Sequence, residues 1–218
     1  SARYGSPLTS KIHRWEQIVR KWVWKLLSAG NPAIYFPVSK EKAIFVPRSF
    51  IPNLTAMKEI KLEIHVRSLN YGELNETDRR LTDAAREATS RSYSPYSHFA
   101  VGAAALLENG TIVTGSNQEN AAYPSGTCAE RTTVFYANSQ YPDQPILTLA
   151  IAARNEAGFL EQPISPCGAC RQVLLETEQR YGKPMRILLC SRTGVYELQG
   201  VKDLLPLSFG QMQLNGEE

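Results

Sequence analysis

The chain is organised around Cys128-Ala129-Glu130-Arg131, read together with a second stretch, Pro166-Cys167-Gly168-Ala169-Cys170. Zinc favours four tetrahedral ligands, and catalytic zinc sites commonly leave one of the four positions to water. The three cysteines would supply thiolates to one Zn²⁺ per chain, and Glu130 could take a proton from that water and return it. A thiolate trio with a carboxylate beside its first member therefore favours a catalytic zinc site.

Each stretch is expected to open a helix, because helix N-termini carry partial positive charge and lower the pKa of a thiol. Thr127 could cap the first helix, and Pro166 is of the type tolerated in the first turn of the second, which should run to about Tyr181. Zinc with three thiolates carries a formal charge of minus one, which weakens its effect on bound water. Arg131 is interpreted as electrostatic support that donates hydrogen bonds to the thiolates, and a solvated helix arginine is the alternative.

Other interpretations of the cysteines remain open at this point. A structural four-cysteine site would need Cys190, but this residue ends an apolar run typical of a buried strand, where a lone thiol is ordinary packing. A thioredoxin-like redox pair needs no third cysteine and no Cys-Ala-Glu. His98 could replace a cysteine as a ligand, although a polar loop histidine explains it as well.

Composition limits the other classes of function. The 218 residues suit one domain with an appendage, and no uninterrupted apolar run is long enough to span a membrane. Residues 57–218 hold fifteen Lys and Arg against nineteen Asp and Glu, so the basic charge of the chain comes from residues 1–56. This balance argues against a nucleic-acid partner for the core. Four cysteines, three of them assigned to metal, fit a reducing compartment such as the cytoplasm.

Residues 1–56 are treated as a basic N-terminal extension, separate from a catalytic domain over residues 57–218. Apolar residues from Ile12 to Leu27 follow one helical stripe, with basic residues largely away from it. Such a helix could lie on an anionic membrane, bind a partner or act as a transit segment. Translation from Met57, with an over-extended gene model upstream, is the interpretation favoured by composition, and residues 30–56 are expected to be loop or short strands.

From Met57 onward, strands alternate with helices, which implies an α/β sandwich. Strands are expected over residues 61–66, 99–107, 111–116, 147–153 and 185–191, and helices over 75–90, from residue 127 and from residue 166. The tail over residues 201–209 suggests a short helix and a turn.

With these residues placed, the chain from about Leu74 to Leu214 resembles the cytidine deaminases of the three-cysteine, homotetrameric class. The resemblance rests on five motifs in the order of the family: Tyr96-Ser97-His98-Phe99-Ala100-Val101-Gly102-Ala103, Asn117-Gln118-Glu119-Asn120, Thr127-Cys128-Ala129-Glu130-Arg131, Pro166-Cys167-Gly168-Ala169-Cys170-Arg171-Gln172 and Leu204-Leu205-Pro206-Leu207-Ser208-Phe209-Gly210. It implies a three-layer α/β/α sandwich around a mixed five-stranded sheet. It also implies a homotetramer whose subunits share active sites.

The resemblance also implies roles for individual residues. Asn117 and Glu119 would hydrogen-bond the ribose 3′-hydroxyl, and an amide with a carboxylate at strand-end spacing does offer a donor and an acceptor, although turn chemistry is the alternative. Phe99 and Phe209 would pack against the nucleoside, with the subunit that supplies Phe209 left open. The N–H of Ala129 would meet the base carbonyl. The carbonyl of Ser165 would meet the leaving amino group.

The expected activity is hydrolytic deamination of cytidine and 2′-deoxycytidine, with Glu130 as the proton carrier. A blasticidin-type deaminase is the enzymatic rival because it shares the cysteine motifs, but Asn-x-Glu-Asn and Ser-Phe-Gly favour the nucleoside enzyme. A structural zinc or interaction module is the non-enzymatic rival.

Overall fold

The computed structural model describes residues 33–37, 43–47, 59–210, 214 and 216. The chain divides into two units, Ser1–Lys61 and Leu62–Glu218. In the first unit, β1 (Ala33–Pro37) and β2 (Ala43–Pro47) pair as an antiparallel hairpin, with Ala33 opposite Pro47. The short strands expected after residue 30 are therefore present, whereas the expected basic helix from Ile12 to Leu27 lies outside the described residues.

The second unit is built on a mixed sheet of seven strands. In the order in which they pair, six of them are β3 (Arg67–Asn70), β9 (Gly194–Leu198), β8 (Arg186–Cys190), β6 (Ile146–Asn155), β4 (Ala100–Leu107) and β5 (Ile112–Ser116), and β7 (Gly158–Phe159) pairs with β6. The β6–β8 pair is parallel and every other pair is antiparallel. The mixed sheet is confirmed, but it has seven strands and not five. Strands β7 and β9 were not among the expected strands, and β3 follows the expected 61–66 segment.

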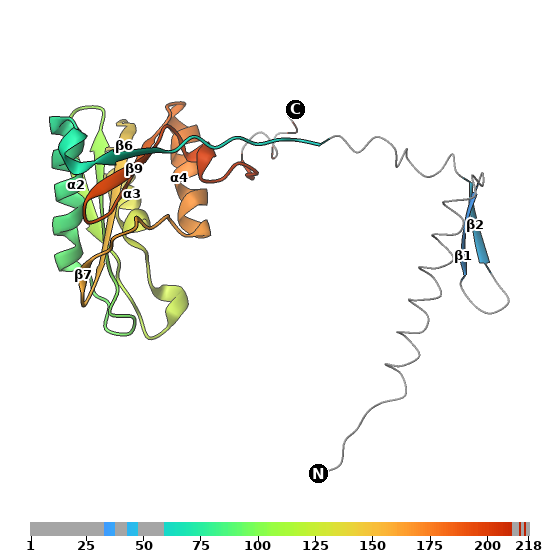
Figure 1. Cartoon of the computed structure of the whole chain (residues 1–218), viewed down its shortest axis with the longest axis horizontal. Helices are drawn as coiled ribbons and strands as arrows, with labels where there is room; N and C mark the ends of the chain where they lie inside the picture. The colour runs from blue at the N-terminus through green and yellow to red at the C-terminus, as the bar shows by residue number, and fades with distance from the viewer. Residues whose placement is uncertain (1–32, 38–42, 48–58, 211–213, 215, 217–218) are drawn as a thin grey trace, which may run out of the picture. The chain divides into compact units, whose positions relative to one another are not determined.

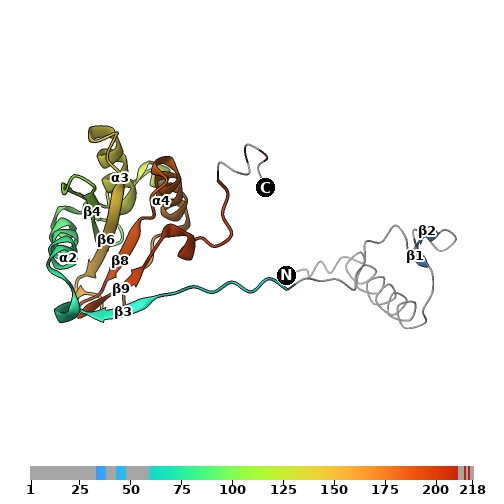
Figure 2. The same cartoon turned by 90° about the horizontal axis from the view of Figure 1, so that it is seen from above.

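Helices cover both faces of this sheet, so the three-layer α/β/α sandwich is confirmed. Figure 2 shows α2 (Glu76–Ala88) on one face, with α3 (Ala129–Gln140) and α4 (Gly168–Tyr181) on the other, and Figure 1 gives the same arrangement from a second side. None of the helices in the described part of the chain is both long and apolar enough to cross a bilayer.

Two local expectations are corrected. The expected strand over residues 61–66 lies outside the sheet, since β3 begins only at Arg67, opposite Glu197, and its partner β9 ends one residue later at Leu198. The apolar side chains of this segment are consequently exposed, at 50% for Leu62 and Ile64 and 49% for Val66. The N-cap of α3 is Cys128 rather than Thr127.

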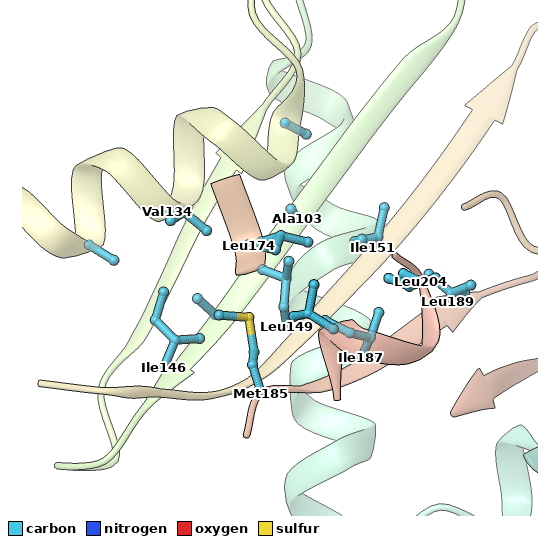
Figure 3. Close-up of a cluster of buried hydrophobic side chains, with 14 of the residues drawn as sticks. Ala103, Val134, Ile146, Leu149, Ile151, Leu174, Met185, Ile187, Leu189 and Leu204 are labelled. Carbon is cyan, nitrogen blue, oxygen red and sulfur yellow. The ribbon is translucent and has the colours of Figure 1, made fainter. Parts of the chain in front are cut away.

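The core between the sheet and the pair α3 and α4 fixes where the two cysteine stretches lie. Val134 from α3 and Leu174 from α4 pack with Leu149 of β6 and Ile187 of β8, and all four are fully buried or nearly so (Figure 3). On the opposite face Leu81 of α2 packs in a second buried cluster. These contacts hold the N-termini of α3 and α4 at fixed places on the sheet.

Glycine permits the close approach of α2 to the sheet. A Cβ built on Gly102 of β4 would lie 2.2 Å from the main-chain oxygen of Ala85 in α2. We therefore expect Gly102→Ala to lower the free energy of unfolding by about 1–3 kcal/mol, measured by urea unfolding, because backbone must move to admit the methyl group. Gly72→Ala is the control, since a Cβ at Gly72 meets nothing within 4 Å. Equal midpoints and slopes for the two variants would contradict this packing.

Candidate active site

Three cysteines converge where α3 and α4 begin. Cys128 is the N-cap of α3, Cys167 is the N-cap of α4, and Cys170 lies in the first turn of α4. Their sulfur atoms all lie within 4.8 Å of one another, and the Sγ atoms of Cys128 and Cys167 are 3.8 Å apart. A tetrahedral zinc ion with Zn–S bonds of about 2.3 Å requires sulfurs about 3.8 Å apart, so the donor set fits the metal.

The cysteines at the two helix N-termini point their sulfur atoms at the cluster and do not cap their helices. Neither the Cys128 nor the Cys167 side chain accepts a capping hydrogen bond from a main-chain N–H of its own helix. The first N–H groups of both helices and the positive ends of their dipoles therefore face the cluster. This field stabilises thiolates, as the sequence predicts.

The protonation of the cluster also favours a bound cation. A hydrogen bond from Cys170 and another from Arg131 lower the pKa of Cys128 to about 5. The same bond to Cys128, together with burial, raises the pKa of Cys170 far above its usual range. The Cys128 thiolate is thus stabilised by the neighbouring Cys170 thiol. Ionising all three cysteines at this distance requires a cation between them, because the like charges repel one another.

Cys190 takes no part in the cluster. It is buried in β8, where burial raises the pKa of its thiol to about 11. Within the described residues the metal-ligand cluster holds Cys128, Cys167 and Cys170 only. The four-cysteine structural site is therefore not supported. His98 does not belong to the cluster either; it lies in a loop with a left-handed φ of 54°.

Glu130 lies in the first turn of α3, close to the cysteine cluster, and is not one of the metal ligands. Its side chain faces the pocket described below, yet the residue is only 4% exposed. Burial raises the pKa of its carboxyl above the usual value, and the charge on Cys128 adds to the shift. A raised pKa suits a group that must both accept and release a proton.

Arg131 contacts the cluster as the sequence predicts. Its Nη2 donates to the Sγ of Cys128 at 3.8 Å, and this bond raises the pKa of the guanidinium. Its Nε is buried and makes no hydrogen bond in the part of the chain that the structure describes. The side chain is therefore turned into the site and is not a solvated surface arginine.

A pocket of about 620 Å³ opens beside the cysteines. Its lining includes seven of the residues expected from the sequence, which are Asn117, Glu119, Cys128, Glu130, Arg131, Ser165 and Cys167. The remaining four do not line it. Cys170 and Ala129 are fully buried, Phe99 packs partly buried against the core, and Phe209 is 58% exposed in the C-terminal segment.

Asn117 and Glu119 are held by the loop that precedes β4. The Oδ1 of Asn117 accepts from the hydroxyl of Ser92 at 2.6 Å and from Val101 N at 2.8 Å, while its Nδ2 donates to Phe99 O at 2.9 Å. The Oε2 of Glu119 accepts from Tyr96 N at 2.9 Å and from Ser97 N at 3.3 Å, and its Oε1 accepts from the Ser97 hydroxyl. The bond from Ser97 is the main cause of the lowered pKa of Glu119.

The sequence did not single out two aromatic residues of the pocket. Tyr96 and Tyr123 line it, and their rings meet edge to face with centroids 6.2 Å apart. Tyr96 stands in one of the motifs quoted for the resemblance, but Tyr123 lies in a 3₁₀ turn (Tyr123–Ser125) whose place beside the loop follows only from the tertiary fold.

Comparisons with known proteins agree with this geometry. The family model described as "Cytidine and deoxycytidylate deaminase zinc-binding region" matches residues 75–181. A cytidine deaminase from Sporosarcina psychrophila is 40% identical over 136 residues, which cover 62% of this chain and 93% of the relative. One from Halalkalibacterium halodurans is 36% identical over 135 residues, covering 62% and 96%. The crystal structure of a cytidine deaminase from Burkholderia pseudomallei superposes with a TM-score of 0.51 and 38% identity, covering 60% of this chain and 97% of that one.

A cluster of three cysteines at two helix N-termini, with a buried carboxylate facing an adjoining pocket, defines a zinc-dependent hydrolase. The chain belongs to the cytidine deaminase family, whose members are zinc-binding enzymes that deaminate cytidine. The resemblance drawn from the sequence is thereby confirmed.

Proposed function

We propose that this chain hydrolyses the exocyclic amino group of cytidine and of 2′-deoxycytidine, which yields uridine or 2′-deoxyuridine and ammonia. The observation that carries the proposal is the placement of Glu130, a buried carboxylate that faces the same pocket as the cysteine cluster. Zinc, when bound by Cys128, Cys167 and Cys170, supplies a Lewis acid that activates water.

Glu130 is the proton carrier of this reaction. Two carboxylates, Glu119 and Glu130, line the pocket, and their surroundings shift their pKa values in opposite directions. The two carboxylates can therefore have different roles: Glu119 stays ionised and binds substrate, and Glu130 carries protons. Glu130 accepts a proton from the attacking water and passes it to the ring nitrogen beside the reacting carbon. It then takes the remaining proton of the added hydroxyl, which becomes the carbonyl, and delivers it to the amino group as the carbon–nitrogen bond breaks and ammonia leaves.

The hydrogen-bonding capacity left on two residues suits a sugar hydroxyl. The Nδ2 of Asn117 has two N–H groups, of which one is used by Phe99 O, so it can donate one more. The carboxylate of Glu119 has about four acceptor positions, of which three are filled by Tyr96 and Ser97. Together they can donate one bond to a hydroxyl oxygen and accept one from its proton, as expected for the ribose 3′-hydroxyl.

This arrangement predicts strong discrimination at the 3′-position. Removing the hydroxyl leaves polar groups in the pocket without their partner, so 3′-deoxycytidine should have a kcat/KM at least about 100-fold below that of cytidine. 2′-Deoxycytidine should stay within about tenfold of cytidine. Steady-state rates for the three nucleosides measure both ratios, and equal rates for cytidine and 3′-deoxycytidine would remove Asn117 and Glu119 from this role.

The remaining contacts complete the proposed binding mode. Ala129 opens α3, where the main-chain N–H has no partner within the helix and can meet the base carbonyl. Ser165 lines the pocket beside Cys167, where its carbonyl can accept from the amino group. Phe99 and Phe209 pack against the nucleoside. Arg131 offsets the charge of the thiolates.

Blasticidin S separates the proposal from its nearest rival. The purified chain should consume cytidine, followed as loss of absorbance, and leave blasticidin S unchanged. Consumption of blasticidin S with cytidine untouched would replace the nucleoside reaction with the blasticidin-type one. Absence of turnover with both compounds would favour a structural zinc module.

The assembly and organisation of the chain belong to the same proposal. A homotetramer with shared active sites accounts for the exposure of Phe209, Phe135 and Tyr136, each more than half exposed in the single chain. Light scattering of the purified protein should give four times the mass of the chain.

Residues 57–218 form the catalytic domain and residues 1–56 a separate basic extension. Four free cysteines support a cytoplasmic location for the domain, with no nucleic-acid partner.

A further inference from the structure

One guanidinium beside the zinc ligands joins two segments of the chain. Arg171 follows Cys170 in α4, and its three nitrogen atoms donate to three different acceptors. The Nε bonds Pro166 O at 2.8 Å, the Nη1 bonds Leu204 O at 2.8 Å and the Nη2 bonds the hydroxyl of Ser165 at 2.9 Å. Two of the acceptors are main-chain carbonyls, so these bonds fix backbone rather than surface side chains.

The first of these segments forms a wall of the pocket. The chain between β7 and α4 has no regular secondary structure, and its end, with Ser165 and Cys167, lines the pocket. A segment without a strand or helix ladder depends on side-chain bonds to hold its carbonyl groups. The two hydrogen bonds from Arg171 to Ser165 and Pro166 fix the backbone directly before the ligand Cys167.

The second segment leads to Phe209. Leu204 follows a short 3₁₀ helix (Val201–Asp203), and the chain continues from it to the exposed phenylalanine. Gln172 donates from its Nε2 to Phe209 O at 2.8 Å. Arg171 and Gln172 thus attach this segment to α4 at two points, both within two residues of Cys170.

Arginine is suited to this task in a way that lysine is not. Its guanidinium is planar and holds five N–H donors in a fixed fork, which lets one side chain serve acceptors in several directions. A lysine at residue 171 keeps the positive charge but is a single flexible point of donation. Substitution by lysine therefore separates the geometry of the fork from its charge.

We propose that Arg171 is a positioning residue for the nucleoside, which sets the Ser165 wall and the C-terminal segment with Phe209 at fixed places relative to the cysteine cluster. The inference rests on the roles proposed above for Ser165 and Phe209. Both roles concern binding of the nucleoside, whereas the metal ligands and Glu130 are held by α3 and α4 themselves. Loss of the fork therefore raises KM and leaves the chemical step largely intact.

The test is steady-state kinetics of the zinc-loaded full chain with Arg171→Lys. KM for cytidine should rise about tenfold, the size expected from losing a charge-assisted hydrogen bond, while kcat stays within about threefold. Zinc content should stay at one ion per chain. Arg180→Lys is the matched control, because Arg180 lies in the last turn of the same helix and is exposed. It should keep the KM of the wild type.

A second variant keeps the proposal testable if the lysine variant does not fold. Ser165→Ala removes one acceptor of the fork and keeps the main-chain carbonyl, so KM should rise about threefold. In the Arg171→Lys background it should add little, because the two residues act through one bond. An unchanged KM in either single variant, or a loss of zinc or kcat without a rise in KM, would overturn the inference. A wild-type chain that does not turn over cytidine would instead remove the proposed function on which the inference depends.

Discussion

Replacing Glu130 by glutamine should lower kcat for cytidine by at least about a thousandfold and leave one zinc ion bound per chain. Glutamine keeps the size of the side chain and fills the same buried place, but it cannot accept and return a proton. Zinc stays because the described cluster of metal ligands consists of three cysteines and does not include Glu130. The measurement is kcat with saturating cytidine, alongside metal analysis of the same preparation.

The control for this variant is Glu176→Gln on the exposed face of α4, which removes the same charge away from the pocket. It should retain the kcat of the wild type. A Glu130→Gln protein that keeps kcat within about tenfold would assign proton transfer to another group. Loss of zinc from that protein would instead show that the carboxylate supports the metal.

Replacing Cys167 by alanine should abolish both zinc retention and turnover. Three thiolates are the full ligand cluster among the residues that the structure describes, and two of them cannot hold zinc against a chelator at the affinity of a structured site. We expect less than about a tenth of a zinc ion per chain after dialysis against EDTA, and kcat/KM lowered by more than about a thousandfold. Cys167 is the most informative ligand to change because it is exposed, so alanine creates no buried cavity.

Cys190→Ala is the matched control for the ligand variant. Cys190 is buried in β8, outside the cluster, so its replacement should cost stability of about 1–2 kcal/mol yet leave zinc content and turnover unchanged. Loss of zinc from this variant would return Cys190 to the metal site. Full zinc retention by Cys167→Ala would mean that the cluster holds its metal by other groups.

The cysteine site could be predicted from the sequence because its information is local. Ligands at residues 167 and 170 lie on one turn of a helix, and a carboxylate two residues after Cys128 lies on the first turn of another. The prediction that Thr127 caps α3 was wrong because the metal site, and not helix capping, determines the residue at this position. General preferences favour threonine at an N-cap, but the chain places Cys128 there, where a cysteine is aimed at the metal and not at its own helix.

The parts of the fold that the sequence did not predict depend on pairing between distant residues. Strand β9 contains Glu197, a charged residue that argues against a buried strand, yet Glu197 is 3% exposed. Arg186 and Arg67 compensate it with ion pairs of 2.7 and 2.9 Å. These partners lie on the two neighbouring strands, β8 and β3, and no local pattern reveals them.

The pocket shows the same limit. Asn117 and Glu119 were predicted from motif and spacing. The sequence did not predict that most of the hydrogen bonds of their side chains go to the loop with Ser92, Tyr96 and Ser97. The roles of Arg171 and of Tyr123 likewise depend on which segments the fold brings together. The groups that perform the chemistry can therefore be predicted from the sequence more readily than the groups that position them.

X-ray absorption spectroscopy at the zinc edge of the purified full chain tests directly whether three cysteines bind zinc and leave its fourth position to water. We expect three sulfur neighbours at about 2.3 Å and one oxygen or nitrogen neighbour at about 2.0–2.2 Å, so that one coordination position beside Glu130 is available to water. A shell of four sulfurs would contradict it, because it would close the metal to water and leave Glu130 with nothing to act on.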